Sequence, residues 1–212
     1  MFEFRGIYNH CGDTYSSSDI EITNKQSVQK LVTLVEKIKA IEVLGSIVKV
    51  PVVGTGSTPG CCHPIDEYKL LNELHPGNYS LMDAFQVSVG SCEESDVACH
   101  ILSRIITVFP TYAVMDAGFL AVSKDSPELN FGTVVSPNTD LYIAGMSQEA
   151  GKLKLKTGKN RDMTTMFNVG DLVKILPAHS CHTAAFHPMY HLVRTVGKQS
   201  EVLKTITPCR GW

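Results

Sequence analysis

The sequence has little of what marks a nucleic-acid-binding, membrane-spanning or secreted protein. Its formal net charge is -2, and no cluster of lysine or arginine stands out, which argues against a nucleic acid or an anionic membrane surface as a partner. No apolar run is long enough to span a bilayer. The first residues lack a charged segment followed by an apolar one, so no secretory signal is visible. Together these absences favour a cytoplasmic location.

Cysteine is present, but not in the pattern of a disulfide framework. Seven cysteines is an odd number, and their spacing along the chain is irregular. With no secretory signal, this pattern favours free thiols in a reducing compartment. We interpret the adjacent pair Cys61-Cys62 as packing rather than as a site.

The first part of the chain has the rhythm of a strand, a helix and a second strand. We expect a buried strand over residues 2–8, and an amphipathic helix from about Asn24, where apolar residues recur at helical spacing. Residues 46–53 are rich in β-branched residues, which is typical of a parallel strand covered on both faces. This order predicts an α/β domain over residues 1–91.

After residue 92 the pattern changes to short runs separated by turn residues. Such runs predict a mostly antiparallel β-domain over residues 92–212. The expected strands cover residues 97–108, 113–116, 141–146, 152–156, 172–176, 189–196 and 201–206. The predicted fold class is therefore α/β plus β.

Two glycine turns follow predicted strands of the first domain. Gly56, Ser57 and Thr58 form one, and Gly77 and Asn78 form the other. Backbone amides in a tight turn, together with hydroxyl groups, can hold a phosphate. The lysine of a P-loop and the spacing of a dinucleotide fingerprint are both missing, which argues against a nucleotide. Either turn alone is more often an ordinary loop, but two in adjacent units favour a phosphate site.

His10 is predicted to end the first strand at the same edge of the sheet as these turns. It is a candidate general base or cofactor contact, and Tyr15 can point its phenol into the same pocket. The alternative for His10 is a hydrogen-bonded structural histidine.

His179 and Cys181 follow the strand predicted over residues 172–176. If the strand continues, side chains two apart share one face, so an imidazole and a thiolate can converge on one ion. Zinc is the first candidate for such a pair. The alternative is a loop histidine beside an inert cysteine. His182 is expected to point away from Cys181.

Six segments together resemble the eukaryotic-type D-serine dehydratases, relatives of D-threonine aldolase and alanine racemase. They occur in the family's order, so the resemblance extends over essentially the whole chain: residues 6–15, 56–59, 75–79, 116–118, 147–149 and 170–181. The resemblance implies the C-terminal part of a (β/α)8 barrel that holds pyridoxal 5'-phosphate, followed by a β-domain that carries zinc.

The resemblance also implies roles for individual residues. The cofactor would be held or lined by His10, Tyr15, Gly56, Ser57, Thr58, Gly77, Asn78 and Tyr79, and zinc would be bound by His179 and Cys181. Cysteine at the second metal position points to a dehydratase rather than an aldolase. The implied reaction removes water from D-serine to give pyruvate and ammonia, with the cofactor as an electron sink and zinc assisting departure of the hydroxyl. A homodimer is the implied assembly.

One family feature has no counterpart in this sequence. The lysine that forms the Schiff base with the cofactor lies upstream of the segment resembling residues 6–15, and Lys49 is a poor substitute. We therefore expect the chain to look N-terminally truncated, to contain no catalytic residue of this type and to be inactive alone. The alternatives are a non-catalytic homologue that binds metal or phosphate and acts through interactions, and an aldolase-like enzyme.

Overall fold

The structure, a computed structural model, describes residues 3–43, 46–137, 139–159, 161–197 and 199–209. The chain forms two compact units, which are treated separately below. Unit 1 comprises Met1–Met82 and Gln86–Asp96, and unit 2 comprises Asp83–Phe85 and Val97–Trp212. The domain division at residues 91 and 92 stays a prediction, since compactness does not test whether a segment folds independently.

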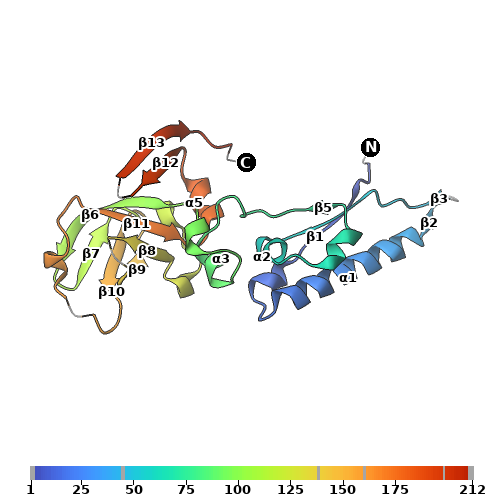
Figure 1. The fold of residues 1–212 in the computed structure, drawn as a ribbon, viewed down its shortest axis with the longest axis horizontal. Helices are drawn as coiled ribbons and strands as arrows, with labels where there is room; N and C mark the ends of the chain where they lie inside the picture. Colours follow the sequence, from blue (N-terminus) through green and yellow to red (C-terminus); the bar gives the residue numbers. More distant parts are fainter. Residues whose placement is uncertain (1–2, 44–45, 138, 160, 198, 210–212) are drawn as a thin grey trace. The chain divides into compact units, whose positions relative to one another are not determined.

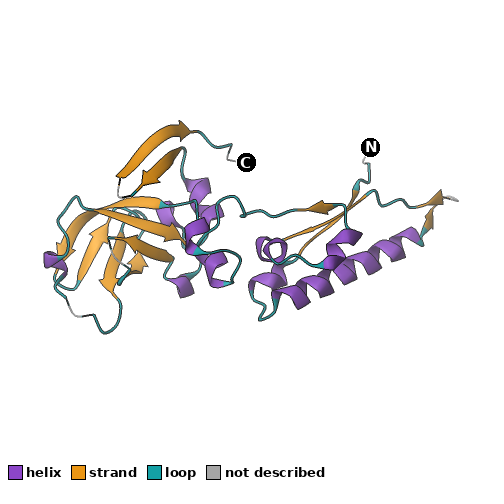
Figure 2. Ribbon diagram, in the orientation of Figure 1, coloured by secondary structure: helices purple, strands orange, loops and turns teal. Residues whose placement is uncertain are grey.

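Unit 1 contains a three-stranded parallel sheet in the order β1-β4-β5. Helix α1 runs alongside these strands (Figures 1 and 2), and the core formed by Leu31, Val35 and Val53 joins the helix to β4. The predicted strand–helix–strand unit is confirmed in β1, α1 and β4. The elements are β1 (Gly6–His10), η1 (Gly12–Tyr15), α1 (Ile20–Lys39), β2 (Glu42–Val43), β3 (Ser46–Ile47), β4 (Val52–Gly56), α2 (Thr58–Cys62), η2 (Asp66–Leu70), β5 (Glu73–Leu74) and η3 (Glu94–Asp96).

Helix α1 begins four residues earlier than the periodicity predicts. Asp19 caps it by accepting a hydrogen bond of 2.9 Å from the backbone N–H of Ile22. A cap of this kind contributes about 1 kcal/mol and fixes where a helix starts. Lys37 and Lys39 occupy the last turn, where positive charge is favourable because the carbonyl ends of the peptides point there.

Two strand predictions in unit 1 are wrong in detail. The first strand begins only at Gly6, and Phe4 before it is exposed; Phe2 lies outside the described residues. The run 46–53 is divided between β3 and β4. Pro51 lies in this run just before β4, and proline cannot donate a hydrogen bond to a sheet ladder.

Unit 2 is built on a six-stranded, mostly antiparallel sheet in the order β8-β11-β6-β7-β10-β9. The end strands β8 and β9 also lie close to each other, so the sheet is nearly closed. Its strands are β6 (Ile101–Phe109), β7 (Tyr112–Met115), β8 (Gly132–Ser136), β9 (Leu141–Met146), β10 (Gly151–Leu155) and β11 (Leu172–Pro177). The predicted fold class, α/β plus β, is confirmed.

The core of unit 2 lies inside this curved sheet. Along β6, Ile101, Ser103 and Ile105 are buried while the residues between them are exposed, as the two-residue period of a strand requires. Met115 and Leu153 meet the same core from β7 and β10. Each of these isoleucine, methionine and leucine side chains stabilises the unit by roughly 1.5–3 kcal/mol on burial.

Helices and a separate hairpin complete unit 2. They are α4 (Phe119–Val122), η4 (Pro127–Leu129), η5 (Met163–Thr165), α5 (Ser180–Phe186), β12 (Tyr190–Val196) and β13 (Gln199–Ile206); α3 (Ala84–Ser88) spans the boundary between the two units. In the described part of the chain, β12 and β13 pair only with each other. No helix among the described residues is long and apolar enough to cross a membrane.

Candidate functional site

The predicted phosphate turns come together in unit 1. Strands β4 and β5 are parallel neighbours, and the turns that follow them are joined by a hydrogen bond of 2.9 Å from the backbone N–H of Asn78 to Oγ1 of Thr58. Glycine is required at position 56, where the backbone of the first turn lies against that of the second. A Cβ at this position would lie 2.3 Å from the carbonyl oxygen of His75. Gly77 has no such neighbour within 4 Å.

The hydroxyl groups of the first turn are buried and bonded. Ser57 caps α2 by accepting a 3.1 Å hydrogen bond from the N–H of Gly60, and its Oγ lies 2.8 Å from Oγ1 of Thr14. Ser57 and Thr58 are both almost fully buried. The hydrogen bonds of these buried side chains therefore stabilise the backbone conformation of the turn.

The other predicted cofactor residues lie at or near the same edge. His10 pairs with Gly56 in the β1–β4 register, and its ring lies 5.8 Å from that of Tyr15 between centroids. Tyr79 follows Asn78 and is exposed. The structure thus brings His10, Tyr15 and the two turns together, while their roles stay predictions.

The predicted metal residues occupy the start of a helix, not a continuing strand. Strand β11 ends at Pro177, His179 is the N-cap of α5, and Cys181 lies in the first turn of that helix and is exposed. The strand geometry expected for His179 and Cys181 is therefore wrong. A carboxylate oxygen of Asp83 accepts the N–H of Ser180 at 2.9 Å, so a negative charge lies at the N-terminus of α5, where it is stabilising.

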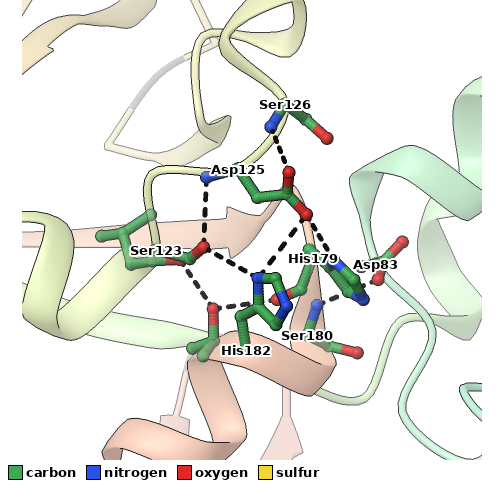
Figure 3. A network of polar contacts seen from close by, with 9 residues as sticks. Asp83, Ser123, Asp125, Ser126, His179, Ser180 and His182 are labelled. Atoms are coloured by element: carbon green, nitrogen blue, oxygen red, sulfur yellow. Dashed lines mark hydrogen bonds and ion pairs between the residues drawn. The ribbon is translucent and has the colours of Figure 1, made fainter.

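Because α5 begins at Ser180, His182 lies on the same side of the helix as His179. Residues three apart on a helix are neighbours, and the rings of His179 and His182 stack at 4.2 Å between centroids. His182 therefore lies beside His179, while its expected orientation away from Cys181 stays a prediction. Figure 3 shows the two rings side by side next to Asp125.

Asp125 is the residue of this cluster that the sequence did not indicate. Its Oδ2 lies 2.5 Å from Nδ1 of His179 and 3.6 Å from Nδ1 of His182 (Figure 3). Asp125, His179 and His182 together form a group that can hold a metal ion, with ligand atoms all within 4.8 Å of one another. The only local signal was a polar turn, Ser-Lys-Asp-Ser, 54 residues before His179.

The charges of this cluster shift its pKa values. Hydrogen bonding to Cys181, opposed by burial and supported by Asp125, raises the pKa of His179 to about 9. The hydrogen bond from His179 holds the pKa of Asp125 below its ordinary value. Burial, with the charges of Asp83 and Cys181, raises the pKa of Cys99 to about 11, so that thiol stays protonated at neutral pH.

Comparisons with known proteins point to one group of enzymes. Residues 98–193 match the family described as "Putative serine dehydratase domain". The chain is 31% identical to a D-serine dehydratase of Dictyostelium discoideum, over 100% of this chain and 55% of that protein. The chain spans about half the length of the curated relatives it matches.

Solved structures agree on the fold. A D-threo-3-hydroxyaspartate dehydratase from Delftia sp. HT23 superposes with a TM-score of 0.83 at 26% identity, covering 98% of this chain and 56% of that one. An alanine racemase-like protein from Idiomarina loihiensis, at 24% identity and covering 88% of this chain and 52% of its own, supports the fold alone with a TM-score of 0.72. A D-threo-3-hydroxyaspartate dehydratase was also solved with one histidine replaced by alanine, and with the cysteine two positions later replaced by alanine in the metal-free form.

Proposed function

The chain belongs to the D-serine dehydratase family, and from that premise we propose that it forms the cofactor-phosphate and metal-binding part of an enzyme that removes water from D-serine. The substrate would lose its α-proton and its β-hydroxyl group as water. The enamine that results would take up one water to give pyruvate and ammonia. Pyridoxal 5'-phosphate, when bound, supplies an electron sink for the carbanion at Cα.

The residues at the edge of the unit 1 sheet fit the phosphate of that cofactor. Two turns at the carboxyl ends of neighbouring parallel strands are held together by the Asn78–Thr58 hydrogen bond, in the position where α/β proteins bind phosphate groups. Gly56, Ser57, Thr58, Gly77 and Asn78 would hold the phosphate. His10, Tyr15 and Tyr79 would line the pocket around the ring.

The residues at the start of α5 fit zinc. His179 and Cys181 both lie at the start of α5, the interaction with Cys181 raises the pKa of His179, and imidazole with thiolate is a donor set that zinc favours. The D-threo-3-hydroxyaspartate dehydratase variants replaced a histidine and a cysteine in the same order and at the same spacing. Two protein ligands would leave positions for water and for the hydroxyl group of the substrate.

The observation that carries this proposal is the His179–Cys181 pair beside a carboxylate at one helix start. We expect the chain to take up one zinc ion, measured by titration and metal analysis. Cys181→Ser is expected to lose most of that zinc. Cys209→Ser replaces another exposed cysteine and is expected to keep it. Unchanged zinc content in Cys181→Ser would remove Cys181 as a ligand.

Turnover is proposed for the complete enzyme. In a chimaera, this chain would replace the matched segment of the Dictyostelium protein, and pyruvate release from D-serine would be measured. Activity that disappears with Cys181→Ser supports the proposal. For the chain alone, borohydride reduction after adding pyridoxal 5'-phosphate is expected to label no single lysine stoichiometrically, which mass spectrometry can check. A homodimer, the family's implied assembly, is part of the same proposal.

A further inference from the structure

We propose that Asp125 is a positioning residue that orients His179 toward the metal, and not itself a metal ligand. This inference rests on the zinc site of the proposed function. Two arrangements compete for the same side chains. In the first, Asp125, His179 and His182 are all ligands. In the second, His179 and Cys181 bind the metal, and Asp125 accepts a hydrogen bond from the nitrogen of the His179 ring that does not bind it.

The separation of Asp125 and His179 favours the second arrangement. Oxygen and nitrogen ligands lie about 2.0–2.2 Å from zinc, so two of them in a tetrahedral site are roughly 3.3 Å apart. Oδ2 of Asp125 and Nδ1 of His179 are 2.5 Å apart, which is the separation of a strong hydrogen bond. With Nδ1 donating to the carboxylate, Nε2 is the nitrogen left for a metal.

The backbone around Asp125 holds the carboxylate in that place. The N–H of Ser126 donates to Oδ1 at 3.1 Å, and Oγ of Ser123 accepts the N–H of Asp125 at 3.1 Å. Ser123 and Ser126 adopt left-handed φ values of 88° and 54°, although neither is glycine. Such conformations cost about 1–3 kcal/mol each and persist only where the surroundings enforce them. The loop keeps this conformation, and it aims one carboxylate oxygen at His179.

His182 supports the same imidazole from another side. Its ring stacks on that of His179, while its Nδ1 lies 3.4 Å from Oγ of Ser123. The side chain of His182 is 55% exposed. In this arrangement, stacking limits rotation of the His179 ring and the hydrogen bond to Asp125 selects its tautomer.

The test combines zinc affinity with a direct view of the ligands. Asp125→Asn is expected to weaken zinc binding by about 10- to 100-fold, the usual effect of losing a group that orients a metal-binding histidine. Zinc X-ray absorption is expected to show one sulfur and one imidazole in both the parent and the variant. Asp140→Asn removes another carboxylate of unit 2, one paired with Lys159 and Arg161, and is expected to leave zinc binding unchanged.

His182→Ala keeps the test decisive if Asp125→Asn does not fold. Our inference predicts a smaller loss of zinc affinity than in Asp125→Asn, because His182 restrains the His179 ring by stacking but supplies no ligand. A site made of Asp125, His179 and His182 would instead lose its zinc in this variant, and the zinc absorption spectrum of the parent protein would show two imidazoles and no sulfur. That result would overturn the inference, as would an Asp125→Asn protein that binds zinc as tightly as the parent.

A measurement on the metal-free protein separates this inference from the proposed function. A low-field proton resonance from Nδ1–H of His179, lost in both Asp125→Asn and His179→Gln, is expected in the parent. If it is absent, Asp125 does not hold the imidazole, even where zinc binds. If the resonance is present but no zinc is taken up, the proposed metal site fails, and the positioning role fails with it.

Discussion

The two units use polar side chains in opposite ways at their candidate sites. In unit 1, Ser57 and Thr58 are almost fully buried and are hydrogen-bonded within the turns. In unit 2, the side chains of Asp125, His179 and His182 are between 36% and 55% exposed. A buried, satisfied group stabilises the fold because leaving its partner unpaired is costly. A half-exposed cluster of donors and acceptors can change partners, which is what a metal site requires.

From this difference we expect substitutions at the unit 2 cluster to lower zinc affinity. Substitutions in the turns of unit 1 should instead lower the free energy of unfolding. The largest expected effect is at His179. His179→Ala should weaken zinc binding by more than about 100-fold, beyond the range for a group outside the ligand set, while the unfolding midpoint of the metal-free protein, compared above pH 9 where His179 has lost its charge, changes little. Isothermal titration and thermal unfolding measure the two quantities. His191→Ala, which replaces an exposed histidine of β12, should change neither; equal zinc loss in both variants would break the comparison.

The next effect is expected at Gly56. In Gly56→Ala the new methyl group would lie 2.3 Å from a backbone oxygen of His75, so β4 and β5 must separate, at a cost of about 1–3 kcal/mol. Urea unfolding followed by circular dichroism checks this. Gly77→Ala adds the same methyl group where nothing lies within 4 Å and should stay within about 0.5 kcal/mol of the parent. Similar losses in the two variants would contradict the close-approach argument.

A smaller loss of stability is expected from Ser57→Ala. The N–H of Gly60 would lose its cap, and the buried hydroxyl of Thr14 would lose a partner. Loss of a cap costs about 0.5–2 kcal/mol. The same unfolding measurement applies, with exposed Ser18→Ala as the control. If Ser57→Ala is as stable as that control, the turn does not depend on its buried hydroxyls.

The smallest effect is a pH dependence of the metal-free protein. The folded pKa of His179 is raised from 6.5 to about 9 by Cys181 and Asp125. The protonated imidazole therefore stabilises the fold fully below pH 6.5, and this contribution is lost as pH rises through about 9. Solvent screens the effect because 36% of the His179 side chain is exposed,. The melting temperature should fall over this range more in the parent than in His179→Ala; parallel curves would exclude the contribution.

The sequence predicted the elements whose periodicity is strong. Helix α1, the parallel pair β1 and β4, and strand β9 over residues 141–146 were found from the spacing of apolar residues. Strand β8 was missed, and so was helix α5. Helix α5 has only seven residues, and its sequence begins directly after a strand, so a two-residue period was extended too far.

The turns of unit 1 were predictable for a reason that does not apply to Asp125. Successive parallel strands place their carboxyl ends at one edge, so local sequence was enough to bring Gly56 and Asn78 together. The contact between Asp125 and His179 spans 54 residues and depends on how α4, the following loop and α5 pack. No spacing rule connects these two positions.

The hairpin β12–β13 bears on how the protein behaves at high concentration. Nearly every residue of the two strands is exposed, including Leu192, Val196 and Val202. Among the described residues these strands have no further sheet neighbour. Unpaired edges with apolar side chains are templates for strand addition and aggregation. Replacing Val196 with lysine is therefore a rational first step toward a sample that stays dispersed during crystallisation or spectroscopy.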